Sequence, residues 1–420
     1  MLDNAQVKNT RAVLIKVITG GMTEYDNDIC LDELSRLLDT AGGEEALRVT
    51  QLRNSPDVRT YVGKGKAEEI AQAIKNDGNI ELAIVDDELT PSQIKNLENV
   101  LDIRVIDRTM LILDIFALHA VTSEGKLQVE IACLRYTSPR LIGKGKDMSR
   151  LGGGIGTRGP GESKLESDRR HLKRNIAALE LQLDEIEKSR GIQRSARQKS
   201  KIKTVAIVGY TNAGKSTLLN YLTGAGILVE DKLFATLDPT TRRLTLSDGK
   251  EILLTDTVGF IDRLPTHLVK AFKSTLEELK YADIIINLTD SSECDSEKCR
   301  KHAVTETLIR ELGAADKPIL EVYNKSDLER DSILVPQDAI KISAKSGAGV
   351  DIMLQKLTDI VNDGKKKVKL FFNHENNGEL SKIHTVATVL NTEYNENGTL
   401  VYIECEEKVL NKYKQFVFEH

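Results

Sequence analysis

The stretch that most constrains the fold is residues 209–217, which follow the pattern G-x-x-x-x-G-K-S. The short apolar run Thr204–Val208 precedes it, and Leu218–Leu222 can continue it as a helix. In this strand–loop–helix order the glycines let backbone N–H groups converge on phosphate oxygens, and the helix N-terminus favours an anion. The sequence therefore predicts an α/β nucleotide-binding domain with a parallel sheet.

Each part of this loop has an expected role. We expect Lys215 to reach the β- and γ-phosphates and the Ser216 hydroxyl to hold Mg²⁺. A glycine-rich turn that binds nothing is disfavoured, because further motifs follow in the expected order. The predicted nucleotide-contacting residues of the loop are Gly209, Tyr210, Thr211, Asn212, Ala213, Gly214, Lys215, Ser216 and Thr217.

A second motif, D-x-x-G, follows the apolar run Ile252–Thr255. Asp256 is expected to hold Mg²⁺, directly or through water, and the Gly259 N–H to contact the γ-phosphate. We expect Lys215 and Gly259 to be the catalytic groups. The predicted contacts here are Asp256, Thr257, Val258 and Gly259.

Two later motifs predict the base. N-K-x-D follows the run Leu320–Tyr323, and its carboxylate can accept two hydrogen bonds from the N1–H and N2 amino groups of guanine. Adenine lacks this donor pair, so the predicted substrate is GTP. The S-A-K triplet is expected to contact guanine O6 through its backbone. The residues concerned are Asn324, Lys325, Asp327, Ser343, Ala344 and Lys345.

The segment between the first two motifs, residues 233–243, must supply a threonine that contacts Mg²⁺ and the γ-phosphate. We expect Thr236 in this role, with Thr241 second and Thr240 a further candidate. The predicted nucleotide contacts here are Phe234, Ala235, Thr236, Leu237 and Asp238, and the predicted metal ligands are Ser216, Thr236 and Asp256.

The first 115 residues read as a separate α/β domain. Strand-like runs (12–18, 47–52, 82–85 and 103–106) alternate with helical patterns (32–38, 67–74 and 91–97), which predicts a parallel sheet. The basic stretch Tyr61–Lys66 is either a solvated turn or a contact for a nucleic-acid backbone. We expect Asp86–Glu88 to be a solvated turn rather than a metal site.

Residues 116–200 predict a helical hairpin, with helices at Lys126–Tyr136 and Lys164–Glu187. The joining loop, 143–161, holds eight glycines among basic residues, so it cannot bury a core. Its glycines allow close backbone approach and its basic side chains can neutralise phosphates, which favours RNA over a plain flexible linker. Residues 201–364 are then the nucleotide domain, and 365–420 a small α+β domain.

Composition excludes several classes. The net charge is −5 with 29% charged residues, so any nucleic-acid contact must come from a local basic patch. The five cysteines include no C-x-x-C pair, which disfavours a zinc site or a disulfide framework. Without a signal peptide or an apolar run of ~20 residues, the chain is expected to be a cytoplasmic monomer that is not inserted in a membrane.

Taken together, these motifs resemble the HflX family of translational GTPases. The specific matches are Gly152–Glu162, Glu124–Glu130, Gly209–Thr217, Phe234–Pro239 and Asp256–Ile261. The resemblance implies binding to the ribosome, chiefly to its large subunit, with loop 143–161 reaching toward the peptidyl-transferase centre. It also implies GTP-dependent splitting of stalled or idle ribosomes under stress. The alternative is a GTP-regulated assembly or dormancy factor in which hydrolysis only times release.

Two residues refine the expected chemistry. Phe260 stands where Ras-like GTPases carry a glutamine that orients water, so intrinsic hydrolysis should be slow and depend on another group or on the ribosome. Asn212 resembles the potassium-coordinating asparagine of some relatives, and K⁺ would add positive charge near the phosphates; the alternative is an asparagine that stabilises the turn. The chain departs from the common family pattern at Glu162–Glu166 and at Thr137–Ser138, beside loop 143–161.

Overall fold

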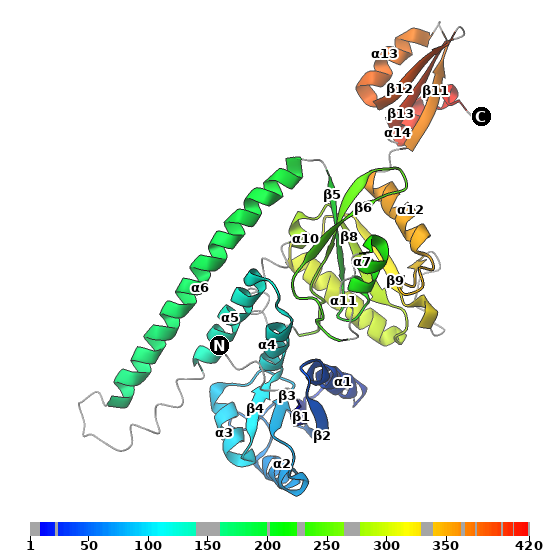
Figure 1. Cartoon of the computed structure of the whole chain (residues 1–420). Coiled ribbons are helices and arrows are strands. Elements are labelled where there is room, and N and C mark those ends of the chain that lie inside the picture. The colour runs from blue at the N-terminus through cyan, green and yellow to red at the C-terminus, as the bar shows by residue number, and fades with distance from the viewer. Residues whose placement is uncertain are drawn as a thin grey trace.

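The structure is a computed structural model that describes residues 9–21, 24–139, 160–199, 202–224, 232–263, 278–328, 339–362, 366–373, 376–395, 398–405 and 407–418. It contains three sheets, described in turn below, and one long helix, α6 (Pro160–Lys199), which runs along one side of the molecule (Figure 1). The predicted multidomain α/β architecture is confirmed. Among the described residues, no helix combines the length and apolarity needed to cross a membrane.

The N-terminal sheet is parallel, with strand order β2-β1-β3-β4. Helices α1 and α4 pack on one face of it, and α2 and α3 on the other. The elements are β1 (Arg11–Ile18), α1 (Glu24–Thr40), β2 (Glu44–Leu52), α2 (Lys64–Asp77), β3 (Leu82–Val85), α3 (Pro91–Leu101), β4 (Arg104–Asp107) and α4 (Arg108–His119). All the predicted strands and helices of this region are present.

Two stretches of this region differ from expectation. Helix α4 was not predicted, because it is apolar nearly all round and buried, so it lacks the one-sided stripe that marks a surface helix. The stretch Tyr61–Lys66 is not a solvated turn. Tyr61 and Val62 are buried in the core, and Lys64 begins α2.

The predicted helical hairpin is confirmed in its two helices. These are α5 (Ser123–Thr137) and α6 (Pro160–Lys199), which lie side by side and run in opposite directions (Figure 1). Arg135 of α5 forms an ion pair with Glu180 of α6. Loop 143–161 lies outside the described residues, apart from the backbone of the two residues that open α6.

The nucleotide domain has a six-stranded sheet in the order β10-β9-β8-β5-β7-β6, parallel except for β6. Its elements are β5 (Lys203–Gly209), α7 (Lys215–Thr223), β6 (Thr240–Thr245), β7 (Glu251–Asp256), α10 (Glu278–Tyr281), β8 (Ile284–Asp290), α11 (Asp295–Glu311), β9 (Ile319–Asn324), β10 (Ile340–Lys341) and α12 (Val350–Val361). The predicted strands are confirmed. Thr240 and Thr241, expected in a loop, instead begin the edge strand β6.

The C-terminal region is an antiparallel sheet in the order β11-β13-β12 with small helices. Its elements are β11 (Lys366–Phe372), α13 (Asn377–Val386), β12 (Thr388–Asn395), β13 (Gly398–Cys405) and α14 (Glu407–Lys412). It lies beyond α12, at the far end of the molecule from the N-terminal sheet (Figure 1).

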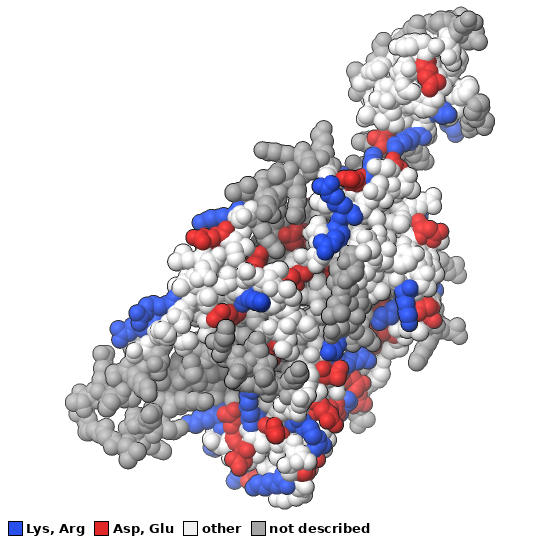
Figure 2. Space-filling model, viewed as in Figure 1, with Lys and Arg blue, Asp and Glu red and all other residues white. Residues whose placement is uncertain are grey.

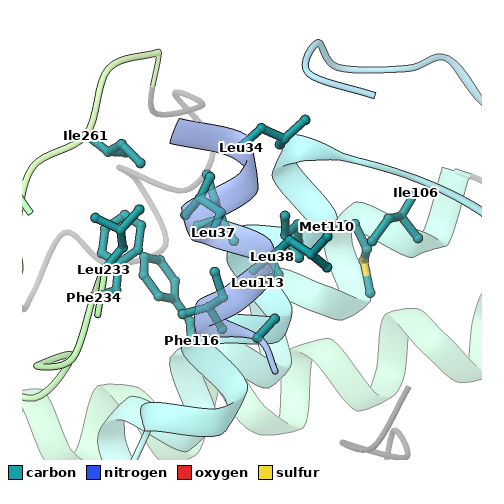
Figure 3. Close-up of a cluster of buried hydrophobic side chains, with 14 of the residues drawn as sticks. Leu34, Leu37, Leu38, Ile106, Met110, Leu113, Phe116, Leu233, Phe234 and Ile261 are labelled. Atoms are coloured by element: carbon teal, nitrogen blue, oxygen red, sulfur yellow. The ribbon is translucent and has the colours of Figure 1, made fainter. Parts of the chain in front are cut away.

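One hydrophobic cluster joins the N-terminal and nucleotide regions (Figure 3). It combines Leu37 of α1 and Phe116 of α4 with Leu233, Phe234 and Ile261, which come from the two loops expected to sense the γ-phosphate. The Phe116 and Phe234 rings meet edge to face, with centroids 4.8 Å apart. Apolar burial of this kind is a principal source of stability, so the two regions share a core.

Candidate functional site

A cavity of about 560 Å³ lies at the carboxyl edge of the nucleotide-domain sheet, where β5, β7 and β9 end. It brings together residues from all the predicted motifs. The lining residues are Thr211, Asn212, Gly214, Lys215, Ser216, Thr217, Lys232, Phe234, Ala235, Thr236, Thr257, Gly259, Asn324, Lys325, Asp327, Leu328, Ala344 and Lys345. Sequence reasoning missed Lys232 and Leu328, which belong to no motif.

The 209–217 loop turns from β5 into α7 through backbone conformations that suit glycine. Gly214, at the start of α7, has a φ of 93°, and an added Cβ would overlap the Asn324 amide. Lys215 is 6% exposed, and its Nζ donates to the carbonyl oxygens of Gly209 (3.2 Å) and Tyr210 (2.9 Å). Burial lowers the pKa of Lys215 to about 8, although nearby Asp256 opposes the shift.

Side-chain oxygen atoms of Ser216, Thr236 and Asp256 come together in this site. Ser216 Oγ donates to Asp256 Oδ2 (2.6 Å) and lies 2.8 Å from Thr236 Oγ1. Burial raises the pKa of Asp256, with Lys215 and Ser216 opposing the shift. Among the residues that the structure describes, Asp256 Oδ1 and Thr211 Oγ1 are buried without a hydrogen-bond partner. Mg²⁺ prefers oxygen ligands, so a buried carboxylate oxygen that lacks a hydrogen-bond partner, next to two hydroxyl groups, fits a magnesium site.

The two candidate threonines are separated by this geometry. Thr236 lies with Ser216 and lines the cavity. Thr241 lies in β6, and its Oγ1 is 3.0 Å from Thr255 Oγ1 on the neighbouring strand. Thr240 is also in β6 and is not among the lining residues. The arrangement therefore favours Thr236.

The D-x-x-G turn forms another wall of the cavity. A Cβ added at Gly259 would lie 2.9 Å from Thr211 Cα and 3.0 Å from Lys215 Nζ, so only glycine fits there. The next residue, Phe260, is 1% exposed and packs in the core. Its backbone is fixed to the 209–217 loop, because Thr211 N donates to Phe260 O (2.7 Å) and Phe260 N to Gly209 O (3.1 Å).

The base-binding motifs meet at the other end of the cavity. Asn324 links them to the phosphate loop, since its Nδ2 donates to Ala213 O (2.8 Å) and its Oδ1 accepts from Ala344 N (2.9 Å). Lys325 forms an ion pair with Asp290 (2.7 Å). The Asp327 carboxylate lines the cavity, and hydrogen bonding by Ser343 lowers its pKa. Asp327 is therefore held ionised as an acceptor.

Several predicted residues lie outside the cavity lining. Gly209, Ala213, Asp256, Val258 and Ser343 lie just behind it, in the strand ends and turns that carry the lining residues. Leu237 and Asp238, predicted as nucleotide contacts, lie elsewhere. Leu237 is buried in the cluster shared with the N-terminal region, and Asp238 hydrogen-bonds the start of α5. Local sequence could not show this for Asp238, because its partners are more than a hundred residues away.

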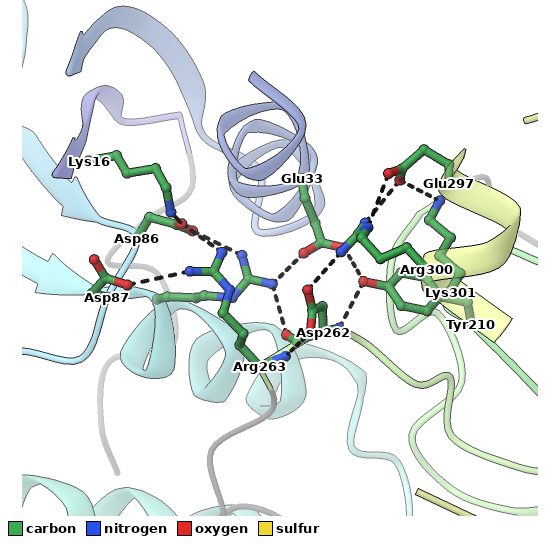
Figure 4. A network of polar contacts seen from close by, with 11 residues as sticks. Lys16, Glu33, Asp86, Asp87, Tyr210, Asp262, Arg263, Glu297, Arg300 and Lys301 are labelled. Atoms are coloured by element: carbon green, nitrogen blue, oxygen red, sulfur yellow. Dashed lines mark hydrogen bonds and ion pairs between the residues drawn. The ribbon is translucent and has the colours of Figure 1, made fainter. Parts of the chain in front are cut away.

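Tyr210 also points away from the cavity and joins a polar network (Figure 4). Its hydroxyl donates to Glu33 of α1 and accepts from the Asp262 backbone N–H (2.8 Å). Arg300 of α11 in turn pairs with Asp262 (2.8 Å). The phosphate loop and the segment after D-x-x-G are thus tied to the N-terminal region through one hydroxyl group.

The same network ends at Asp86, which is 1% exposed and not in a solvated turn as expected. Three cations surround it: Lys16, Arg108 (3.0 Å) and Arg263 (2.7 Å). Burial alone would raise the pKa of Asp86, but these cations hold it below its ordinary value. Within the described residues, no group of three or more His, Cys, Asp or Glu side chains is placed to hold a metal.

The surface shows no broad field of one sign in the view of Figure 2. Lys and Arg are interspersed with Asp and Glu over the described residues of that face.

Comparison with known families covers most of the chain. Three family models match: the N-terminal region of GTP-binding GTPases at residues 28–117, their middle region at 119–197, and a 50S ribosome-binding GTPase at 204–325.

Individual proteins match over similar lengths. The GTPase HflX of Caldanaerobacter subterraneus subsp. tengcongensis is 47% identical over 410 residues, 97% of this chain and 94% of that protein. The GTPase HflX of Escherichia coli is 43% identical over 337 residues, 78% of each chain. Among solved structures, a GTP-binding protein from Sulfolobus solfataricus in complex with GDP aligns over 84% of this chain and 99% of that one, with 26% identity and a TM-score of 0.44.

Proposed function

This chain belongs to the HflX family of GTPases and is a GTP hydrolase, and from that premise we propose that it binds the large ribosomal subunit and uses GTP to split stalled or idle ribosomes under stress. The observation that carries the proposal is the cavity in which the four GTPase motifs converge. It lies in the nucleotide domain, of which residues 204–325 match a 50S ribosome-binding GTPase. Loop 143–161, glycine-rich and basic, supports contact with ribosomal RNA.

The site geometry supports a role for each of the following residues. Lys215 pairs with the β- and γ-phosphates, and the Gly259 N–H donates to the γ-phosphate. Ser216, Thr236 and Asp256 would hold Mg²⁺, which when bound would neutralise charge on the phosphates. The buried Asp256 Oδ1, which has no hydrogen-bond partner in the described part of the chain, and the Ser216–Thr236 contact of 2.8 Å support this ligand set.

Guanine specificity is assigned to Asp327. Its carboxylate, ionised and at the cavity wall, accepts from the base, while Asn324 holds the base-binding and phosphate-binding loops at a fixed spacing. Asp327→Asn replaces one acceptor oxygen with a donor, so GTP affinity should fall about tenfold or more. The exposed Asp77→Asn is a matched control, and equal effects of the two substitutions would contradict the assignment.

Hydrolysis by the isolated protein should be slow. Phe260 is buried and cannot orient the attacking water. Asn212 lines the cavity, which supports K⁺ coordination next to the phosphates. Its positive φ of 63° is the conformation expected of the alternative, an asparagine that stabilises the turn. The stimulating group is therefore expected to come from K⁺, from the ribosome, or from both.

The test is the GTP turnover rate of the purified monomeric protein, alone and with large subunits, in K⁺ and in Na⁺ buffers. We expect slow turnover alone and strong stimulation by subunits, lost when residues 143–161 are replaced by a short Gly-Ser linker. Absence of stimulation by subunits or intact ribosomes would reject the ribosomal proposal. Stimulation without dissociation of intact ribosomes would favour an assembly or dormancy role instead.

A further inference from the structure

The loop that carries Thr236 is shared between the nucleotide cavity and the N-terminal half of the chain. Ala235 and Thr236 line the cavity. Leu233 and Leu237, on either side of them, are 6% and 2% exposed and buried in the cluster of α1 and α4. The Leu233 backbone N–H also donates to Thr40 Oγ1 at the end of α1 (3.2 Å). The loop therefore cannot change position without disturbing that cluster.

Asp238, at the end of this loop, supports the cap of helix α5 by binding Thr122, the N-cap residue of that helix. Its Oδ2 accepts from the backbone N–H groups of Val121 and Thr122, both at 2.8 Å. Its Oδ1 accepts from Thr122 Oγ1 (2.5 Å), which in turn accepts from Gly125 N (3.0 Å). A carboxylate that accepts three hydrogen bonds at a helix N-terminus is favoured both by charge-assisted bonding and by the helix dipole.

Gly125 shows that this contact is closely fitted. It lies in the first turn of α5, where alanine would ordinarily be the better helix former. A Cβ added at Gly125, however, would overlap Asp238 Oδ1. The glycine thus leaves room for the carboxylate of a residue more than a hundred positions away.

From this geometry we propose that Asp238 is a positioning residue that couples the nucleotide at Thr236 to the orientation of α5. Two residues span at most about 7 Å of chain, so a displacement of Thr236 beyond the slack of that short segment must also move Asp238. Hydrogen bonds of 2.5–2.8 Å do not survive a displacement of an ångström or more. Either the cap breaks or α5 moves with the loop.

The coupling is reciprocal. If GTP and GDP favour different positions of the loop, the cap on α5 must in turn shift the ratio of GTP to GDP affinity by the same factor. Helix α5 leads in sequence to loop 143–161, so its N-terminus is the point at which the nucleotide state would reach that loop. The proposal requires only GTP binding and does not depend on which ribosomal state is the target.

The first test measures hydrogen exchange of the segment 118–126 in the full-length protein, saturated with GDP or with a non-hydrolysable GTP analogue. We expect the exchange rates with the two nucleotides to differ by about fivefold or more. In Asp238→Ala the segment should exchange fast with both nucleotides. If this segment exchanged faster in Asp238→Ala but its exchange rate in the unmodified protein did not depend on the nucleotide, the contact would be merely structural and the proposal would be overturned.

The second test disrupts the contact between Asp238 and α5 by a substitution in α5. Gly125→Ala should also abolish the nucleotide dependence of exchange and change the ratio of GTP to GDP affinity. Gly65→Ala is the matched control, since Gly65 lies in the first turn of α2 and an added Cβ there meets no atom within 4 Å. If Gly125→Ala retained the nucleotide dependence, or if both glycine variants lost it, the coupling would not run through Asp238.

Discussion

The N-terminal sheet and the nucleotide-domain sheet, which is parallel except for β6, both place polar groups at the carboxyl ends of their parallel strands, but they use them differently. In the nucleotide domain, Lys215 donates to backbone carbonyls beside an open cavity. In the N-terminal sheet, order β2-β1-β3-β4, the same edge lies at the switch point between β1 and β3 where doubly wound folds bind ligands. There the buried Lys16 is paired with Asp86, and Arg263 of the nucleotide domain completes the site.

The two edges differ in whether their cations are paired with carboxylates, and this decides which edge can bind a ligand and which forms a structural joint between the two domains. Lys215 has no carboxylate as a direct hydrogen-bond partner among the contacts described, so its charge is available to a phosphate. Lys16, Arg108 and Arg263 all contact Asp86. Arg108 and Arg263 also pair with Glu33 and Asp87, so three cations meet three carboxylates and that edge is internally neutralised. Four substitutions or conditions test this contrast, in order of decreasing effect.

The largest effect is expected from Asp86→Ala. Removal of the carboxylate leaves Lys16 and Arg108 buried with too little negative charge, which should cost about 3–5 kcal/mol in the free energy of opening β1 and β3. Asp77→Ala, which breaks the exposed pair with Arg11, should cost about 1 kcal/mol or less. Native-state hydrogen exchange of the two strands measures both values, and similar costs would mean that the Asp86 cluster is not a structural joint.

Lys215→Ala should come next. Loss of the amine removes the charge that pairs with the phosphates, so GTP turnover should fall by about 100-fold or more. Lys16→Met removes the equally buried lysine of the other sheet, and at temperatures where the variant stays folded its turnover should remain near the unmodified rate. A comparable loss of turnover in Lys16→Met would show that the two edges are not functionally distinct.

The third effect is a pH dependence at the nucleotide edge. The pKa of Lys215 is lowered to about 8, so the amine loses its proton and its charge as pH rises through 8. GTP affinity should therefore fall about tenfold between pH 7 and pH 9. Lys215→Arg keeps its charge over this range and should show a flat profile. A flat profile in the unmodified protein would mean that burial does not set this pKa.

The smallest effect is expected from breaking an arginine ion pair, either the pair with buried Asp86 or an exposed one. Arg263→Ala leaves Asp86 with two cations, so it should cost about 1 kcal/mol in the stability of β1 and β3. Arg243→Ala removes an exposed partner of Glu251, 3.5 Å away, and should change stability by about 0.5 kcal/mol or less. If the two substitutions were equivalent, Arg263 would be a surface charge rather than part of the joint.

The nucleotide edge could be predicted from sequence because its functional residues belong to short motifs that directly follow predicted strands. The N-terminal edge could not. The partners of Asp86 are Lys16, Arg108 and Arg263, which lie 70, 22 and 177 positions away, and no local pattern reports such distances. Read alone, three consecutive acidic residues after a strand look like a solvated turn.

Two other failures have similar causes. Strand β6 is polar along its length because it is an edge strand, so it shows no apolar alternation. The motif Phe234–Pro239 predicts a nucleotide contact for Asp238, yet its carboxylate accepts from the backbone at the start of α5. In both cases a residue's role was fixed by its neighbours in space.

The shared cluster around Phe116 and Phe234 has a consequence for how such a gene can be recombined. A cut near residue 200 looks natural, because it falls before the nucleotide domain. It would nevertheless leave Leu37 and Phe116 exposed on one product and Leu233 and Phe234 on the other. Chimaeras that exchange GTPase domains between relatives should therefore be soluble only when both sides of this cluster are inherited from the same parent.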